Sequence, residues 1–235
     1  MDTKPFHFLD VGGQRVTRSK EPSICPHCRR LVQAQEVTWQ PVSSDWKVSG
    51  LESIYVCPNP DCGHFFLATF DLKEKSVQVL GSLSVRKDDF ELRSTTPVMI
   101  ERKEFPPSVV KLSPLFAETY AQAEAAEAYG LTQICGLGYR KAVEYLIKDH
   151  CIDQHPVDTD KIKAMPLGAC IKEFVTDPNV KISAQRAVWL GNDEAHYLRK
   201  WADKDIGDLK ILIMLTSNWI DSLFLTTQYQ DSMKP

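Results

Sequence analysis

The first part of the chain shows the pattern of hydrophobic and polar positions that is typical of strands. Short runs rich in β-branched and aromatic residues occupy 37–39 and 53–56, and longer runs occupy 65–70 and 76–85. Such runs predict strands, and the charged residues 71–75 between the last two runs predict a hairpin turn. Apolar residues occupy both the odd and the even positions of 65–70. Because alternate side chains of a strand point to opposite faces, we expect both faces of this strand to be covered.

The second part of the chain shows helical spacing instead. From residue 113 onward, apolar positions recur at intervals of three and four residues. The polar residues 88–113 that lead into this part contain three prolines and predict a connector between two domains. Pro114 at a first helical position, Gly130 at a stop and Asp205 at an N-cap mark helix ends. The predicted helices cover 114–129, 132–148, 167–175, 183–190 and 206–229, with a loop over 150–165.

Composition and charge limit the classes of function. The chain has 235 residues, of which 43% are hydrophobic and 25% charged, as in an ordinary soluble globular protein. Its net charge of −3 offers no strongly basic surface for duplex nucleic acid, although a local patch at Arg29 and Arg30 stays open. The richest apolar run, Ile211 to Leu215, is five residues long, so we expect no membrane-spanning segment.

Four cysteines form two close pairs that point to a metal. Cys25 and Cys28 are a C-x2-C step, and Cys57 and Cys62 are a C-x4-C step followed by Gly63. Two short turns that each donate two thiolates match the tetrahedral coordination that zinc prefers. A site closed by four cysteines has no open position, so it is expected to be structural.

The remaining cysteines and the nearby histidines have simpler interpretations. His27 and His64 lie beside the pairs and are either alternative ligands or exposed neighbours. The other three cysteines are expected to be small core residues; they are Cys135, Cys151 and Cys170. Because the N-terminal residues do not read as a signal peptide and the paired cysteines read as ligands, a reducing cytoplasm is the expected compartment.

Two motifs in the helical part leave alternatives open. Arg140 and Glu144 are one helical turn apart, either as an intrahelical ion pair or as an arginine held for an anion or a partner helix. Gly191 and Asn192 precede His196, either as a helix end followed by a buried structural histidine or as a site. Gly136-Leu137-Gly138 lies within a helical pattern, which favours close helix packing over nucleotide binding.

Together these pieces resemble a known bacterial family. A CPxC zinc ribbon is followed by Pro-Ser-Val-Val-Lys, an alanine-rich helix, Arg140-Lys-Ala-Val-Glu144 and Gly191-Asn192-x-x-Ala-His196. This order resembles the family catalogued as domain of unknown function 4145, over roughly residues 107–230. That family is grouped with the HEPN superfamily of helical bundles. Many HEPN proteins dimerise and act as metal-independent ribonucleases in toxin–antitoxin, CRISPR and phage-defence systems.

The resemblance implies specific site residues. The superfamily motif is an arginine, four to six residues of any kind and a histidine, often with a polar residue after the arginine. Asn192 matches the polar position and His196 the histidine, but Gly191 stands where the arginine belongs. Since arginine would stabilise the charge that develops during cleavage, Arg140 or Arg186 would have to supply it.

The sequence therefore predicts an α+β protein: a small β-rich zinc ribbon followed by an all-α, HEPN-like bundle. The predicted domains are 1–104, which includes the connector, and 105–235. The expected function is a non-catalytic interaction or nucleic-acid-associated module in bacterial antiviral defence. The alternative is a HEPN-type ribonuclease that uses His196, Asn192, Arg140 and Arg186. Expected partners are a second copy of the chain through the helical domain and RNA, DNA or a defence-system protein, without a membrane.

Overall fold

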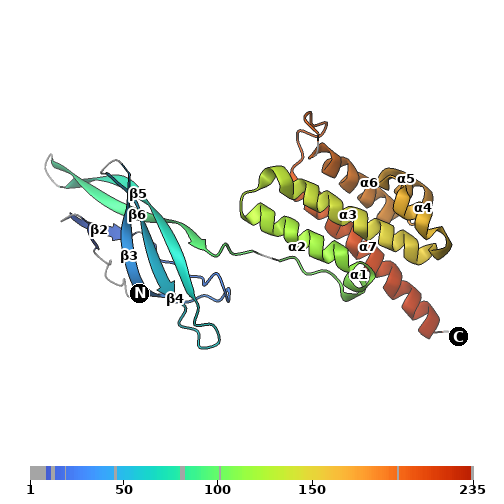
Figure 1. The fold of residues 1–235 in the computed structure, drawn as a ribbon, viewed down its shortest axis with the longest axis horizontal. Coiled ribbons are helices and arrows are strands. Elements are labelled where there is room, and N and C mark those ends of the chain that lie inside the picture. Colours follow the sequence, from blue (N-terminus) through green and yellow to red (C-terminus); the bar gives the residue numbers. More distant parts are fainter. Residues whose placement is uncertain are drawn as a thin grey trace. The chain divides into compact units, whose positions relative to one another are not determined.

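The chain forms two compact units, residues 1–99 and 100–235. The computed structural model describes residues 9–11, 14–18, 20–44, 47–79, 83–100, 102–194 and 196–233. The first unit is a β-sheet and the second is helical, so the protein is α+β (Figure 1). The division lies five residues before the predicted one, between Met99 and Ile100. The backbone N–H of Lys103 donates to both carboxylate oxygens of Glu124 at 3.1 Å, which ties this stretch to the helices.

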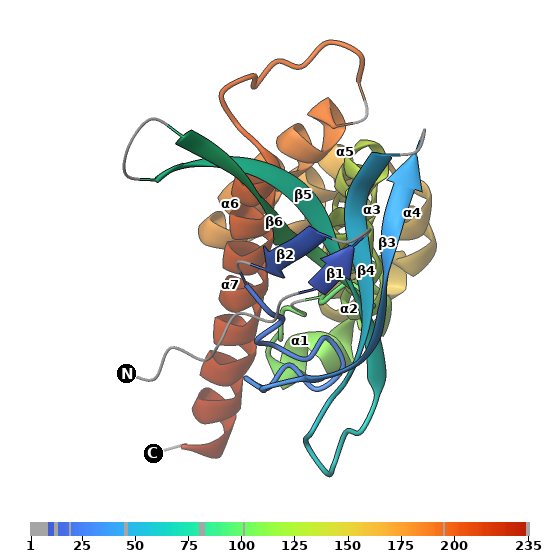
Figure 2. The ribbon, with the colours of Figure 1, turned by 90° about the vertical axis from the view of Figure 1, so that its left-hand side faces the viewer.

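The first unit is one twisted sheet, in the order β1-β2-β6-β5-β4-β3 (Figure 2). The strands β3 to β6 follow one another as an antiparallel meander, and β2 joins the edge of β6 in parallel. The bounds are β1 (Leu9–Val11), β2 (Gln14–Arg18), β3 (Gln35–Ser44), β4 (Lys47–Val56), β5 (Phe65–Val79) and β6 (Leu83–Thr96).

The predicted hairpin turn at residues 71–75 is wrong. These residues lie within β5, where Lys73 pairs with Asp89 and Lys75 with Lys87 of β6. Because β6 satisfies the main chain of this segment, its charged residues do not need to form a turn. Residues 80–82, between β5 and β6, lie outside the described residues.

The predicted connector is also too long. Its first residues, up to Thr96, belong to β6, and its last residues form α1 (Pro107–Leu112). Phe90 of β6 is fully buried and faces the core. The charged residues on either side of it made this strand look like a polar connector in the sequence. The link between sheet and helices is therefore shortened to residues 97–106.

A small core covers one face of the sheet. It contains Leu51 and Tyr55 from β4, and Phe66, Ala68 and Phe70 from β5, all buried. Phe65 is 63% exposed, and Leu67 is only partly buried. The prediction that both faces of this strand are covered is thus wrong, because the sheet buries alternate residues on one side.

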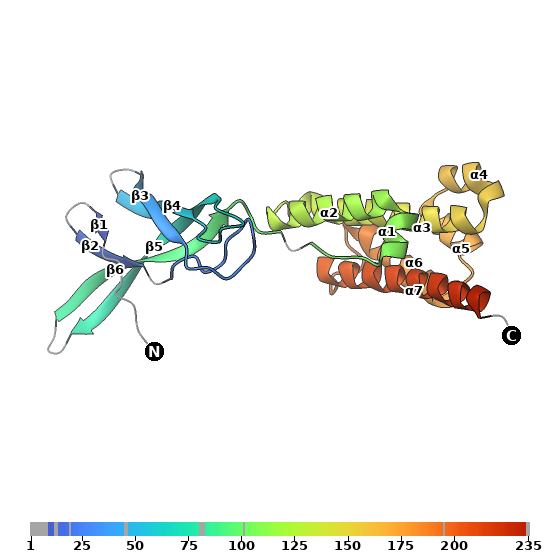
Figure 3. The same cartoon turned by 90° about the horizontal axis from the view of Figure 1, so that it is seen from below.

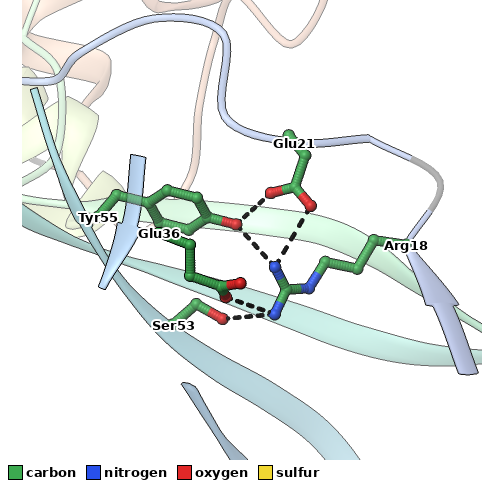
Figure 4. A network of polar contacts seen from close by, with 5 residues as sticks. All are labelled: Arg18, Glu21, Glu36, Ser53 and Tyr55. Carbon is green, nitrogen blue, oxygen red and sulfur yellow. Dashed lines mark hydrogen bonds and ion pairs between the residues drawn. The ribbon is translucent and has the colours of Figure 1, made fainter. Parts of the chain in front are cut away.

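A buried arginine links the strands around this core (Figure 4). The Arg18 guanidinium donates to Glu36 Oε1 at 2.6 Å, to Ser53 Oγ at 2.9 Å and to the Tyr55 hydroxyl at 3.0 Å. It also pairs with Glu21, whose other carboxylate oxygen accepts from the Tyr55 hydroxyl. Burial, with the Glu21 hydrogen bond second, raises the pKa of Tyr55 above its usual range. The Arg18 side chain of β2 is thereby bonded to Glu21, which precedes the first cysteine pair, and to residues of β3 and β4.

The second unit is a helical bundle centred on α3. The helix α2 lies beside α3, and α6 packs along α7 (Figures 1 and 3). The core is one continuous cluster of buried side chains from every α-helix, among them Phe116, Tyr139, Leu146, Ile171 and Ile213. The bounds are α2 (Pro114–Ala128), α3 (Thr132–Gln154), a 3-10 turn (Pro156–Asp158), α4 (Thr159–Ala164), α5 (Leu167–Phe174), α6 (Pro178–Asp193) and α7 (Ile206–Ser232).

The helix ends agree with the sequence where a cap is explicit. Asp205 caps α7 in a reciprocal capping box with Asp208, as predicted for the N-cap, and Gly130 after α2 has φ +73°. The predicted loop 150–165 is wrong, because α3 continues to Gln154 and α4 follows. The helix α6 begins five residues before the prediction, at Pro178, where the Asp177 side chain accepts from two backbone N–H groups.

The helix α7 corrects the expectation that no segment could cross a membrane. It has 27 residues, and its most apolar window has a mean hydropathy of 1.2, so it passes by length and composition. The core helix of a soluble protein can pass the same test, and α7 buries Leu209, Ile213 and Ile220 in the bundle. This single helix is weak evidence for a membrane protein.

Other predictions about the helical core hold. Cys135, Cys151 and Cys170 are all buried. A Cβ on Gly138 would lie 2.9 Å from the Ala123 Cβ, and one on Gly136 would lie 2.6 Å from the Glu194 Cγ. Both glycines therefore allow close helix packing, as the sequence indicated.

Candidate metal centre and the cavity at the end of α6

The four paired cysteines come together at one end of the sheet unit. Their sulfur atoms all lie within 4.8 Å of one another. The Sγ atoms of Cys25 and Cys62 are 3.8 Å apart, and those of Cys28 and Cys57 are 3.7 Å apart. Zinc bound to four sulfurs at about 2.3 Å in a tetrahedron separates neighbouring sulfurs by about 3.8 Å. The cluster is thus a candidate metal site with the dimensions that zinc requires.

Two tight turns present these thiols. In the first, the N–H of Arg29 donates to the Cys25 carbonyl at 2.8 Å, and Arg29 has φ +59°. In the second, the N–H groups of Cys62 and Gly63 both donate to the Asn59 carbonyl, and Gly63 has φ +60°. A hydrogen bond from the Arg30 backbone lowers the pKa of the Cys28 thiol to about 6, whereas burial raises the pKa of the neighbouring Cys57 thiol to about 12. Without a metal, Cys28 is therefore the thiol of this pair that ionises first.

The two neighbouring histidines lie outside this cluster of ligands. Their rings stack with centroids 4.6 Å apart. His27 Nε2 lies 3.0 Å from the Phe65 carbonyl, and His64 Nδ1 lies 3.6 Å from the Cys62 sulfur. Of the two alternatives, the structure favours exposed neighbours, since the four thiols complete the set without them. In this position a histidine can orient or hydrogen-bond a ligand from the second layer.

The second candidate site begins where α3 crosses α6. A Cβ on Gly191 would lie only 2.8 Å from the Arg140 Cβ, so the missing side chain makes room for Arg140. The Arg140 Nε donates to the Asn192 Oδ1 at 2.7 Å. The predicted pairing of Arg140 with Glu144 is wrong, because Glu144 pairs with Lys148 at 3.1 Å and Lys141 at 3.4 Å. The alternative that Arg140 contacts another helix is correct, since Asn192 belongs to α6.

The acidic residues after Asn192 fix the loop that leads to α7. The Asp193 side chain is buried, and its Oδ2 accepts from the backbone N–H groups of Lys200 and Trp201 at 2.8 and 2.7 Å. Glu194 pairs with Arg199 at 2.8 Å. One carboxylate thus closes residues 194–200 into a ring against the end of α6.

His196 lies on this loop and is exposed. Its backbone N–H donates to the Asp193 carbonyl at 3.3 Å, and within the described residues its imidazole has no hydrogen-bond partner. The expectation of a buried structural histidine is therefore wrong. His196 and Asn192 line the same cavity, of about 720 Å³, together with Trp189, Tyr197, Lys200 and Trp201.

A second cavity, of about 430 Å³, adjoins the same tryptophans. The rings of Trp189 and Trp201 are nearly parallel, at an angle of 8°, with centroids 6.2 Å apart. Arg186 and Lys204 line this second cavity, with Arg186 exposed and donating to the Ile182 carbonyl of its own helix. The tryptophans and Lys200 received no role in the sequence analysis. Trp189 and Trp201 come together because Asp193, on the helix of Trp189, accepts from the backbone N–H of Trp201. In the structure their exposed fractions of 47% and 42% identify them as surface aromatic residues.

The predicted site residues thus fall into three places. Asn192 and His196 share a cavity, Arg140 reaches Asn192 from α3, and Arg186 lines the adjoining cavity. No protein-family model, curated protein or solved structure matches this chain.

Proposed function

We propose that this protein is a non-catalytic binding module that associates with single-stranded nucleic acid in a bacterial defence system. In this proposal the first unit is a structural zinc ribbon and the second a HEPN-like bundle in a cytoplasmic homodimer. The observation that carries the proposal is the pair of exposed, nearly parallel tryptophans flanked by two cavities with basic residues.

The chemistry of this surface suits unpaired bases. Exposed indoles stack on any base, and basic side chains nearby neutralise phosphates. Within the described part of the chain, Arg186 and Lys200 have no ion pair with a carboxylate, so their charges are free for an anion. A net charge of −3 makes binding along duplex DNA unfavourable, whereas a local aromatic and basic surface can bind a short single strand.

The absence of catalysis is proposed from the partners of the candidate catalytic groups. Asn192 is held by Arg140, and the Asp193 carboxylate is used by the loop. The His196 imidazole has no oriented hydrogen-bond partner in the described residues. A general base is normally held by a neighbouring group so that its proton transfer is directed.

The ribonuclease stays as a second candidate because of one contact. The Arg140 Nε reaches Asn192 across the position of Gly191, so an arginine from α3 stands near the place where the family motif has its own. Asn192 in turn shares a cavity with His196. In this alternative Arg140 stabilises the charge that develops on the phosphate and His196 transfers the proton.

A binding and cleavage experiment separates the two functions. Fluorescence anisotropy with a labelled single-stranded oligonucleotide is expected to give binding that weakens with salt. Trp189→Ala is expected to weaken it about tenfold, since stacking one base contributes about 1–3 kcal/mol. The control is Tyr229→Ala, because Tyr229 is an exposed aromatic residue, at 61%, that lines neither cavity and is not part of the apolar row of α7 described below. Equal losses in both variants would refute the assignment.

Cleavage is tested with the same oligonucleotide as RNA. We expect wild-type protein to cut no faster than His196→Ala, a substitution that should leave stability almost unchanged because His196 is exposed. Cleavage by the wild type that is lost in His196→Ala and in Arg140→Met would instead establish the ribonuclease.

The proposed dimer is supported by an apolar row on α7. Ile211, Leu215 and Trp219 are spaced four residues apart and are 53%, 39% and 41% exposed. Residues at this spacing share one face of a helix, and an uncovered face of this kind is typical of an interface. Light scattering is expected to give twice the chain mass for the wild type and the monomer mass for Leu215→Glu. A wild-type monomer at micromolar concentrations would rule this out.

A further inference from the structure

The contact between Asn192 and Arg140 fixes a polar group in the wall of the cavity at the end of α6. Asn192 belongs to α6 and lines this cavity. Its Oδ1 accepts from the Arg140 Nε at 2.7 Å. Because a guanidinium has donors and no acceptor, the atom of Asn192 that faces Arg140 must be the amide oxygen. The arginine therefore determines which way round the planar amide lies.

The fixed amide presents its nitrogen to the cavity. Arg140 does not line the cavity, so the Asn192 oxygen that bonds to it is turned away from the cavity. The Asn192 Nδ2 carries two N–H donors. Within the described residues it donates to no group, and it is not one of the buried polar atoms that lack a partner, so it keeps contact with solvent. The amide nitrogen is thus a free donor pair in the cavity wall.

The other polar groups of this wall are mostly donors or already bonded. The Lys200 ammonium carries three donors and has no ion pair with a described carboxylate. Asp193 is only 5% exposed, and its Oδ2 accepts from two backbone N–H groups of the loop. The His196 imidazole can donate or accept. A ligand that fits this wall therefore presents acceptors to Asn192 and Lys200.

The two purine bases differ in this respect. Guanine presents two neighbouring acceptors, O6 and N7, whereas adenine presents the N7 acceptor beside its N6 amino donor. A donor of the wall that faces the adenine amino group would lose its partner from water without gaining another, which disfavours adenine. Since both purines have a flat aromatic face, stacking on Trp189 and Trp201 does not distinguish them.

We propose that Asn192 and Lys200 select guanine over adenine at one position of a bound single strand, and that Arg140 is the positioning residue for the amide. The Asn192 Nδ2 and the Lys200 Nζ would donate to guanine O6 and N7 while the base lies beside the tryptophans. This inference rests on the proposed association with single-stranded nucleic acid and assigns a base preference to it.

The test compares RNA hexamers by fluorescence anisotropy on the full chain. The first hexamer has adenosine throughout, the second has one central guanosine, and the third has inosine in that place. The guanosine hexamer is expected to bind about fivefold more tightly than the adenosine hexamer, the effect of about one net hydrogen bond. The inosine hexamer should match it, because inosine keeps both O6 and N7.

The outcomes separate this inference from the proposed function. Equal binding of the adenosine and guanosine hexamers would overturn the base preference and leave the nucleic-acid association standing. An inosine hexamer that binds as weakly as adenosine would also overturn the preference, because the contact would then not be to O6 and N7. Absence of binding by every hexamer would overturn both proposals.

Three variants assign the preference to its residues. Asn192→Asp keeps a partner for Arg140 but presents an acceptor to the cavity, so it should abolish or reverse the preference for guanosine. Arg140→Met lets the amide turn, so the ratio of the two Kd values should fall towards one. The matched control is Arg186→Met, since Arg186 lines the adjoining cavity and does not contact Asn192. It should weaken both hexamers and keep their fivefold ratio. An unchanged ratio in Asn192→Asp, or an equal fall in both arginine variants, would overturn the proposal.

Discussion

The two units of this protein are stabilised in different ways. The sheet unit has a small core, to which a cluster of four cysteines and the buried Arg18 network add a few concentrated contacts. The helical unit has one continuous core that draws side chains from every α-helix. Loss of one group should therefore affect the sheet far more than the bundle, since small units depend on metals or specific polar contacts.

The largest expected effect is the loss of metal. Each chain should hold one zinc on Cys25, Cys28, Cys57 and Cys62. Because structural zinc contributes about 10–16 kcal/mol of apparent binding free energy, chelation or Cys57→Ser should unfold the sheet unit while the helices remain. Elemental analysis and circular dichroism measure both. Cys135→Ser is the control, since Cys135 is buried in the bundle away from the cluster. Freshly purified protein without zinc would disprove the site.

The next effect comes from the buried arginine. Arg18→Ala removes the common partner of Glu21, Glu36, Ser53 and Tyr55. It should destabilise the sheet unit by about 3 kcal/mol, at the low end for a buried ion pair because both glutamates keep some contact with solvent. Arg93→Ala is the matched control, because its pair with Asp71 is exposed and should contribute less than about 1 kcal/mol. Chemical denaturation compares the two. Equal losses would mean that the Arg18 network has no special role.

The bundle should respond less to a single change. Gly191→Ala places a Cβ 2.8 Å from the Arg140 Cβ, so α3 and α6 must shift or Arg140 must release Asn192. We expect a loss of about 1–3 kcal/mol. Gly168→Ala, where a Cβ meets nothing within 4 Å, should instead be neutral or stabilise by about 0.4–1 kcal/mol. Thermal unfolding distinguishes them, and a harmless Gly191→Ala would show that the crossing is loose.

The smallest effect is a pH dependence that belongs to the bundle. Burial lowers the pKa of His150 below its ordinary value, against the opposing charges of Asp153 and Asp177 and with a small contribution from His155. Near the ordinary pKa of histidine, about 6.5, the unfolded chain therefore binds more protons than the folded chain. The free energy of unfolding should consequently fall as the pH drops below about 6.5. We expect the free energy of unfolding to fall between about pH 6.5 and about pH 5.5. In His150→Gln this part of the pH dependence should be absent; its persistence would assign it to another group.

Sequence reasoning succeeded where neighbours along the chain determine the structure. The C-x2-C and C-x4-C spacings predicted that the four thiols meet, as they do. Asp205 and Gly130 identified helix ends because a cap depends on local hydrogen bonds and φ angles. It failed where partners are distant. The charged residues 71–75 predict a turn when they are considered alone, whereas in the structure they pair with β6.

The candidate site at the end of α6 shows the same limit. Arg140 was paired with Glu144 on its own helix, whereas its partner is Asn192, which is 52 residues further along. The tryptophans of the cavity received no role because their contact depends on the Asp193 carboxylate bonding to the backbone seven and eight residues later. Periodicity describes one helix at a time and does not indicate which helices cross.

The ring closed by Asp193 has a practical consequence for labelling the protein. Tyr197 and Leu198 are 101% and 78% exposed, while the ends of their ring are held at Asp193 and at Lys200. Lengthening a loop whose ends are already fixed costs little, because closure entropy grows slowly with length. A fluorophore or short peptide tag inserted between these two residues should therefore leave Trp201 anchored. The loop therefore offers a place for a reporter within the cavity lining, at Tyr197 and Leu198, while both tryptophans lie outside the altered segment.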